Sequence, residues 1–362
     1  MSYSIRLFEA TDEDYASVAS LYTASAAPLL DFEYEHTSPA LLRHFHAGLG
    51  TNRDQLRCYL AFDDTAHELI GIAQYFPILW VAEPHHYWMM VRVHPRWQKR
   101  GIGSYLQDFL TAELASRGAR VLMMQAHEQT PAIATWVSGH GFHETFRSWQ
   151  LALDPRSCSD GLFHMHDERM AAHGITITTL ADEQRSNPQW LARLYDLHQS
   201  FVRDIPVPDH PNPAPPLSWF VRYACANPEA LPDGFFIAKD GERYIGESFV
   251  QRDSQPGSRV LHHKLTGVRH EGRGRGVATA LKLKTIAYAR AHGYHQITTW
   301  NESNNACMLQ INQKLGFVRR SGTIIFKKQL QDAPVRLSGA LSLPRKKAIA
   351  GDDDVQYALS NS

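Results

Sequence analysis

The sequence of 362 residues has few cysteines, no excess of either charge and no long apolar run. Its four cysteines are scattered without a CxxC pair, which argues against a disulfide scaffold or a zinc knuckle. Because 37 basic residues balance 37 acidic ones, the whole chain has no electrostatic preference for nucleic acid or an anionic membrane. No apolar run approaches the ~18 residues of a membrane helix, and the first residues lack the pattern of a signal peptide. We therefore expect a water-soluble, cytoplasmic protein in which any anion site is local.

The chain contains an internal duplication. A shift of 175 positions relates three pairs of residues, Val93 and Val268, Gly118 and Gly293, and Gly141 and Gly316. A constant shift means that no net insertion separates the copies, and the unit is too long for a solenoid repeat. We therefore expect two related domains at residues 1–155 and 174–330. Segment 156–173, which follows Pro155 and contains Ser157, Ser159 and Gly161, is predicted to be a linker, and 331–362 a poorly ordered tail.

Each copy alternates between strands and helices. In the second copy two strand-like runs flank Asp240-Gly241, which is a hairpin-turn signal, and Val260–Val268 is predicted to be a third strand. A glycine-rich turn leads from this strand into a helix over 277–292. A strand over 296–300 and a second helix that ends before Gly316 follow. The pattern therefore predicts an α/β fold in each copy.

The glycine-rich turn of the second copy has the features of an anion site. The first turn of a helix exposes unpaired backbone N–H groups and the positive end of the helix dipole. Gly274 and Gly276 let an anion approach these groups, and Arg273 and Arg275 add charge. The first copy has the corresponding residues Gln98, Arg100, Gly101 and Gly103. The alternative is a solvated turn that binds no ligand. The occurrence of the same turn at equivalent positions of both copies argues against this alternative. The sequence contains neither the dinucleotide motif GxGxxG nor the phosphate-loop motif GxxxxGK[ST].

These motifs resemble those of a known superfamily. The pattern [QR]-x-x-G-x-[GA], with a valine five residues before it and a helix after it, resembles the pyrophosphate-binding motif of GNAT acetyltransferases. Residues 301–317, which end in Leu-Gly-Phe, resemble the second cofactor segment of that family. The resemblance covers about 5–153 and 175–328, so the chain resembles a tandem GNAT protein. It implies two GNAT-type α/β (α+β) domains, each a mixed, mostly antiparallel sheet with a central splayed strand pair and flanking helices.

The resemblance also implies an activity, that of an N-acetyltransferase with acetyl-CoA as co-substrate and no metal. The primary amine of a small molecule would attack the thioester directly, and the pantetheine arm would lie where the strand at 260–268 splays from the strand at 296–300. In the second copy the implied cofactor residues are Val268, Arg273, Gly274, Arg275, Gly276, Val277, Ala278, Thr279 and Asn305. In the first copy they are Val93, Gln98, Arg100, Gly101, Gly103 and Ser104.

Three side chains are candidates for proton transfer. His262 lies six residues before the motif valine, where relatives with a base on the central strand carry it. Strand alternation places His262, Lys264, Thr266 and Val268 on one face. A histidine that merely lines the strand is the alternative. Glu247 on the neighbouring strand is the second candidate base, with an exposed or salt-bridged glutamate as its alternative. Asn312 stands where many relatives have a tyrosine acid, and an amide can donate a hydrogen bond but not a proton.

The two copies differ at the polar positions. At the shift of 175, Tyr87, Ala126, Thr130 and Val137 in the first copy replace, in that order, His262, Asn301, Asn305 and Asn312. We therefore expect the second copy to be catalytic and the first to be structural or to bind CoA without turnover.

Other functions leave weaker signals in the sequence. A non-catalytic CoA-binding sensor or regulatory protein is the main alternative to an enzyme. Histidine pairs such as His262-His263 lack HExxH spacing, which argues against a metal site. We expect a small-molecule amine as partner, no nucleic acid and no membrane, and a monomer or homodimer, while the sequence does not identify the acceptor.

Overall fold

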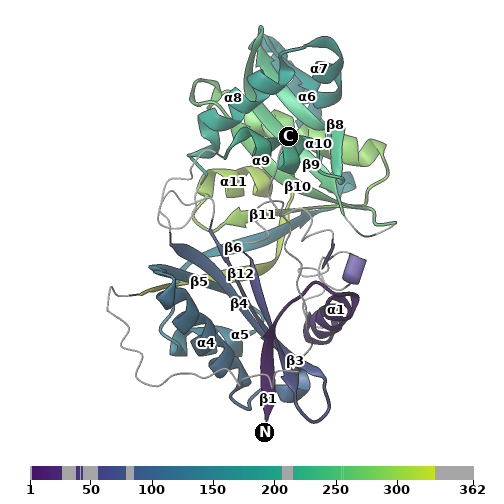
Figure 1. The fold of residues 1–362 in the computed structure, drawn as a ribbon. Coiled ribbons are helices and arrows are strands. Elements are labelled where there is room, and N and C mark those ends of the chain that lie inside the picture. Colours follow the sequence, from purple (N-terminus) through teal and green to yellow (C-terminus); the bar gives the residue numbers. More distant parts are fainter. Residues whose placement is uncertain are drawn as a thin grey trace, which may run out of the picture.

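The structure is a computed structural model that describes residues 2–26, 38–40, 42–43, 56–78, 85–205, 215–253, 255 and 257–330. The N-terminal half, in purple and blue, and the second half, in teal to yellow, are stacked end to end (Figure 1). The tail predicted at 331–362 lies outside the described residues.

Between residues 230 and 315 the second half has the predicted order of three strands, a helix, a strand and a second helix. The elements of the first half are β1 (Tyr3–Leu7), α1 (Asp12–Ala26), β2 (Arg57–Asp63), β3 (Leu69–Pro77), β4 (His86–Val93), η3 (Pro95–Trp97), α4 (Ile102–Ser116), β5 (Val121–His127), α5 (Pro131–Gly139) and β6 (His143–Leu153). The connection between the halves contains η4 (Pro155–Ser157) and α6 (Asp160–Ala172). The second half contains β7 (Ile175–Thr179), α7 (Leu180–Ser186), α8 (Trp190–Val202), α9 (Leu217–Phe220), η5 (Val221–Cys225), β8 (Ala230–Asp240), β9 (Arg243–Arg252), β10 (Val260–Val268), η6 (His270–Gly272), α10 (Val277–Ala291), β11 (Gln296–Glu302), α11 (Ala306–Leu315) and β12 (Val318–Gln329).

The described strands form one sheet of twelve in the order β1-β2-β3-β4-β5-β12-β6-β11-β10-β9-β8-β7. Among the described strands, only β4 with β5 and β10 with β11 pair in parallel, and the other neighbours are antiparallel. The predicted mixed, mostly antiparallel α/β architecture is confirmed.

The last strands of the two halves are exchanged. β12 lies between β5 and β6, with Ile324 opposite Ala126, and β6 pairs with β11, with Gln150 opposite Trp300. Figure 1 shows these two strands crossing the middle of the molecule. Each half of the sheet is thus completed by a strand from the other half. The predicted domain boundaries along the chain stay a prediction.

Matching glycines let the helix after each loop approach the sheet closely. A Cβ built on Gly71 of β3 would lie 3.1 Å from Leu106 of α4, and one built on Gly246 of β9 would lie 3.0 Å from Leu281 of α10. Both pairs are related by the shift of 175 positions. The duplication therefore extends from the sequence to the packing that positions each glycine-rich loop.

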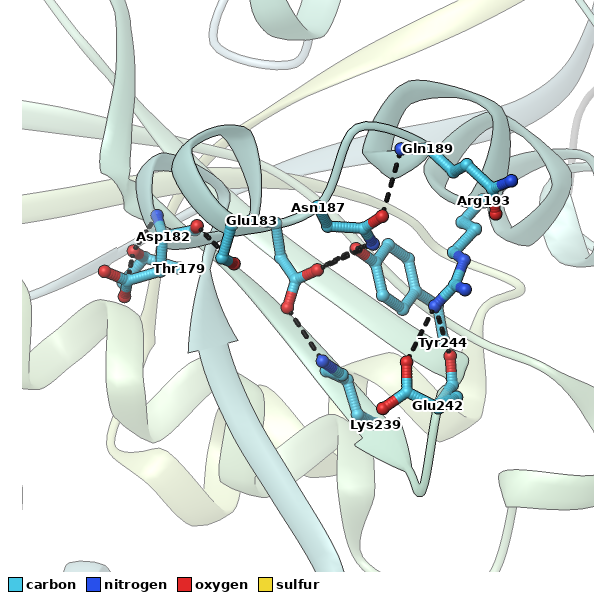
Figure 2. Close-up of polar contacts among 10 residues, drawn as sticks. Thr179, Asp182, Glu183, Asn187, Gln189, Arg193, Lys239, Glu242 and Tyr244 are labelled. Atoms are coloured by element: carbon cyan, nitrogen blue, oxygen red, sulfur yellow. Dashed lines mark hydrogen bonds and ion pairs between the residues drawn. The ribbon is translucent and has the colours of Figure 1, made fainter.

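A buried polar network fixes α7 to the edge of the second half. Glu183 of α7 accepts hydrogen bonds from the Lys239 ammonium at 2.9 Å and from the Asn187 amide at 3.1 Å (Figure 2). The Tyr244 hydroxyl also donates to Glu183, and the Tyr244 carbonyl accepts from Arg269 at 2.8 Å. Because Arg269 follows β10 directly, this network connects α7 with the start of the glycine-rich loop.

Gly267 of β10 allows α8 to rest directly on the strand. A Cβ built there would lie 1.9 Å from Cε2 of Phe201, whose side chain is buried. We predict that Gly267→Ala lowers the free energy of unfolding by about 1–3 kcal/mol because the methyl group overpacks this contact. Chemical denaturation measures the loss, and adding Phe201→Leu should restore part of it. An unchanged denaturation midpoint in Gly267→Ala would contradict this account of how α8 is held.

Candidate functional site

The two central strands of the second half diverge next to the predicted site. β10 and β11 pair from Val260 opposite Gln296 to His263 opposite Thr299, and no pair follows in the described residues. A β-bulge at Lys264 interrupts the pairing of β10 with β9 at the same point. In the first half, β4 and β5 likewise pair over three residues and then diverge. Both copies therefore contain the splayed strand pair that the family resemblance implies.

The loop after each diverging strand is built in the same way. Gly101 and Gly276 precede α4 and α10 in the left-handed conformation, with φ of 83° and 86°. The Gln98 side chain donates to the Val93 carbonyl at 3.1 Å, and the Arg273 side chain donates to the Val268 carbonyl at the same distance. Shared backbone conformations and shared side-chain contacts indicate that the two loops are structural equivalents.

The loop of the second copy presents the start of α10. The N–H groups of Val277, Ala278 and Thr279 belong to the first turn, so they have no acceptor within the helix. The two predicted cationic side chains are held at the sides of the loop. Arg273 pairs with Asp204, and Arg275 pairs with Asp240 at 2.8 Å and donates to the His173 carbonyl at 3.1 Å.

His262 lies immediately before the point of divergence. Its Nδ1 is 2.8 Å from the Thr298 hydroxyl of β11, and its Nε2 is 3.7 Å from a carboxylate oxygen of Asp253. Burial raises the pKa of Asp253, but hydrogen bonds from His262 and Ser258 outweigh burial and hold that pKa below its usual value. With 34% of its side chain exposed, His262 is accessible and faces an ionised carboxylate.

The bulge at Lys264 corrects the predicted face of β10. The Thr266 hydroxyl lies 3.1 Å from Nε2 of His263, so Thr266 shares a face with His263 and not with His262. The prediction that His262, Lys264 and Thr266 share one face is therefore wrong. An extra residue in one strand reverses the alternation of the side chains beyond it.

A buried basic cluster on the α10 side was missed from the sequence. Lys282 of α10 places its ammonium nitrogen 3.3 Å from both ring nitrogens of His263, which also contacts the Ser248 hydroxyl at 2.9 Å. Burial lowers the pKa of Lys282 to about 7 and, together with Lys282, lowers the pKa of His263 well below its usual value. The available signal was a lysine between the apolar residues Leu281 and Leu283 of a helix that packs on a sheet.

Glu247 is inaccessible beneath α8. Its side chain is fully buried, and one carboxylate oxygen lies 2.8 Å from Nδ1 of His198. Burial raises the pKa of Glu247, and His198 acts in the opposite direction. The other carboxylate oxygen has no hydrogen-bond partner among the described residues. His198 was not predicted, because nothing in its local sequence distinguishes it from other helix residues.

The asparagines of the second cofactor segment make contacts within the protein. The buried Asn312 amide of α11 donates to Asn301 of β11, which joins the helix to the strand. The Asn305 side chain accepts from the Met308 N–H at 3.3 Å and caps α11. In the first copy the corresponding Ala126 and Val137 are buried apolar residues. The structure thus separates a polar second site from an apolar first one.

The described part of the chain contains neither a candidate metal site nor a candidate membrane-spanning helix. It contains no group of three or more His, Cys, Asp or Glu side chains that could hold a metal ion. None of its helices is long and apolar enough to cross a membrane.

The duplicated fold, with diverging central strands that each lead through a glycine-rich loop into a helix, defines a tandem acyl-transferring enzyme. Residues 17–142 and 194–317 both match the Acetyltransferase (GNAT) family, and the chain belongs to that family. It is an N-acetyltransferase of the GNAT type.

Several known proteins are similar to this chain. Mycothiol acetyltransferase of Thermobispora bispora is 23% identical over 242 residues, which cover 65% of this chain and 74% of the relative. Mycothiol acetyltransferase of Thermobifida fusca is 24% identical over 337 residues, covering 88% and 95%. A solved tandem GNAT protein from the clavulanic acid biosynthesis pathway superimposes with a TM-score of 0.63 at 14% identity, covering 92% of this chain and all of that one.

Proposed function

We propose that the second copy transfers the acetyl group of acetyl-CoA to the primary amine of a small molecule. The observation that carries this proposal is the divergence of β10 from β11 directly beside His262, with the first turn of α10 at the far end of the same strand. Backbone N–H groups at a glycine-capped helix start suit a diphosphate, and diverging strands leave backbone groups for the pantetheine arm. Holding both reactants in line provides most of the rate increase in a direct transfer.

In this proposal His262 accepts the proton of the attacking ammonium group, directly or through water. Its accessibility and its contact with Asp253 support this role, because a nearby carboxylate stabilises the imidazolium that forms. Glu247 stays a second candidate base, although its complete burial with His198 favours a structural role. Asn312 is proposed to shape the site through its bond to Asn301, since an amide cannot protonate the leaving thiolate.

The first copy is proposed to be non-catalytic. It retains the glycine-capped loop, but Tyr87 and Val137 replace the residues that are His262 and Asn312 in the second copy. A retained loop is compatible with bound CoA, whereas the loss of the polar residues removes the groups proposed to handle protons.

A free-thiol release assay tests the proposed function. Acetyl-CoA is incubated with the protein and with single amines drawn from amino acids, polyamines, amine antibiotics, peptides and the amine precursor of mycothiol. We expect thiol release that depends on one class of amine, with an acetylated product of matching mass. Binding of CoA without thiol release for any amine would favour the sensor instead, and no binding of CoA would contradict both functions.

A further inference from the structure

The helix between the two copies, α6, contacts the glycine-rich loop of the second copy. The Arg169 guanidinium donates a hydrogen bond to the Gly274 carbonyl at 3.0 Å. A Cβ built on Gly276 would lie 3.0 Å from Nε of the same arginine. Because Gly276 directly precedes α10, the side chain of Arg169 lies beside the first turn of that helix.

The first copy provides an internal comparison. A Cβ built on Gly101 would meet no atom of the described residues within 4 Å. Gly101 and Gly276 have the same left-handed conformation and the same position before a helix, so the difference does not come from the loops. The difference between the two loops comes from α6, which places Arg169 beside the loop of the second copy.

The charges around the second loop are not balanced. Arg273 and Arg275 each pair with an aspartate, whereas Arg169 has no carboxylate partner among the residues that the structure describes. A cation near the positive end of a helix dipole is unfavourable in isolation. An anion between the guanidinium and the helix N–H groups would interact favourably with both.

We propose that Arg169 binds the diphosphate of acetyl-CoA in the second copy. A guanidinium presents paired N–H donors that match the oxygens of a phosphate group, so it adds charge-assisted hydrogen bonds to those of the backbone. The inference rests on the proposed function and goes beyond the loop motif, because Arg169 lies about a hundred residues before that motif. It also makes α6 part of the cofactor site and distinguishes the second copy from the first.

Calorimetry with CoA and with acetyl-pantetheine, which lacks the diphosphate, tests this assignment. We expect Arg169→Ala to weaken CoA binding at the site of the second copy about tenfold, because charge-assisted hydrogen bonds to the diphosphate are lost. The variant should bind acetyl-pantetheine as tightly as the wild type does. Arg169→Lys should recover part of the affinity because it retains the charge. The matched control is Arg156→Ala in η4, an arginine that is 75% exposed and pairs with Asp154 away from the loop, for which we expect no change.

Four outcomes would overturn the assignment. Wild-type affinity for CoA in Arg169→Ala would show that the guanidinium does not contact the ligand, and tighter binding would show that it occludes the site. An equal loss of acetyl-pantetheine binding would indicate damage to the loop instead. A wild-type protein that binds no CoA would overturn the proposed function as well. CoA binding to the wild type is therefore measured before binding to any variant.

Discussion

Replacing His262 by alanine should lower kcat by a factor of about 10² or more while leaving CoA affinity and stability nearly unchanged. A positioned acid–base group contributes about 10²–10⁴ to the rate, and His262 is an accessible titratable side chain at the point where β10 and β11 diverge. Its partly exposed position means that its removal creates little buried cavity. The measurement is steady-state thiol release with saturating amine, together with calorimetry for CoA and a denaturation curve.

The duplication offers a matched control for this variant. Tyr87 occupies the position of His262 in the first copy, so Tyr87→Phe removes a polar atom from the equivalent place in the half that we propose to be inactive. Its kcat should equal that of the wild type. Asp253→Asn should have an intermediate effect, because it weakens the support for the imidazolium without removing the imidazole. If His262→Ala retains kcat within threefold, the proton is taken by another group or by water.

The duplicated architecture could be predicted because its signals are local and occur twice. In the sequence, Gly101 and Gly276 each lie between a strand-like run and a run with helical periodicity. In the structure, both glycines adopt the left-handed conformation directly before a helix. The hairpin at Asp240-Gly241 was predicted by its turn residues, and Asp240 pairs with Arg243 across it. Patterns of this kind are set by backbone sterics within a few residues.

The strand exchange could not be predicted because it is not local. β6 and β12 follow equivalent Gly-Phe turns, and no residue pattern in either strand indicates which half of the sheet it joins. The composition of 156–173 indicated a linker but did not indicate α6, whose buried side chains are few. The bulge at Lys264 likewise has no sequence signal, and it changes which side chains of β10 share a face.

Replacing Lys282 by methionine should raise the free energy of unfolding by roughly 3–5 kcal/mol below pH 7, the second large effect we expect. Burial holds the pKa of Lys282 at about 7, against 10.5 for an exposed lysine. The unfolded chain therefore binds more protons between these values, so the wild-type protein gains stability as pH rises from about 7 towards 10.5 and loses it as pH falls. Methionine has a similar volume and no charge to desolvate, so the variant should lack this dependence.

Denaturation at pH 6, 8 and 10 separates this effect from a general change in packing. The difference between Lys282→Met and wild type should shrink as pH rises, whereas Lys284→Met should differ little from wild type at every pH, because Lys284 is one-third exposed and pairs with Asp167 at the surface. A smaller dependence below pH 6.5 should remain in Lys282→Met, since burial alone still disfavours a charged His263. A Lys282→Met variant that is less stable than wild type by the same amount at all three pH values would contradict the prediction. That result would show that the Lys282 side chain and its contact with His263 stabilise the fold.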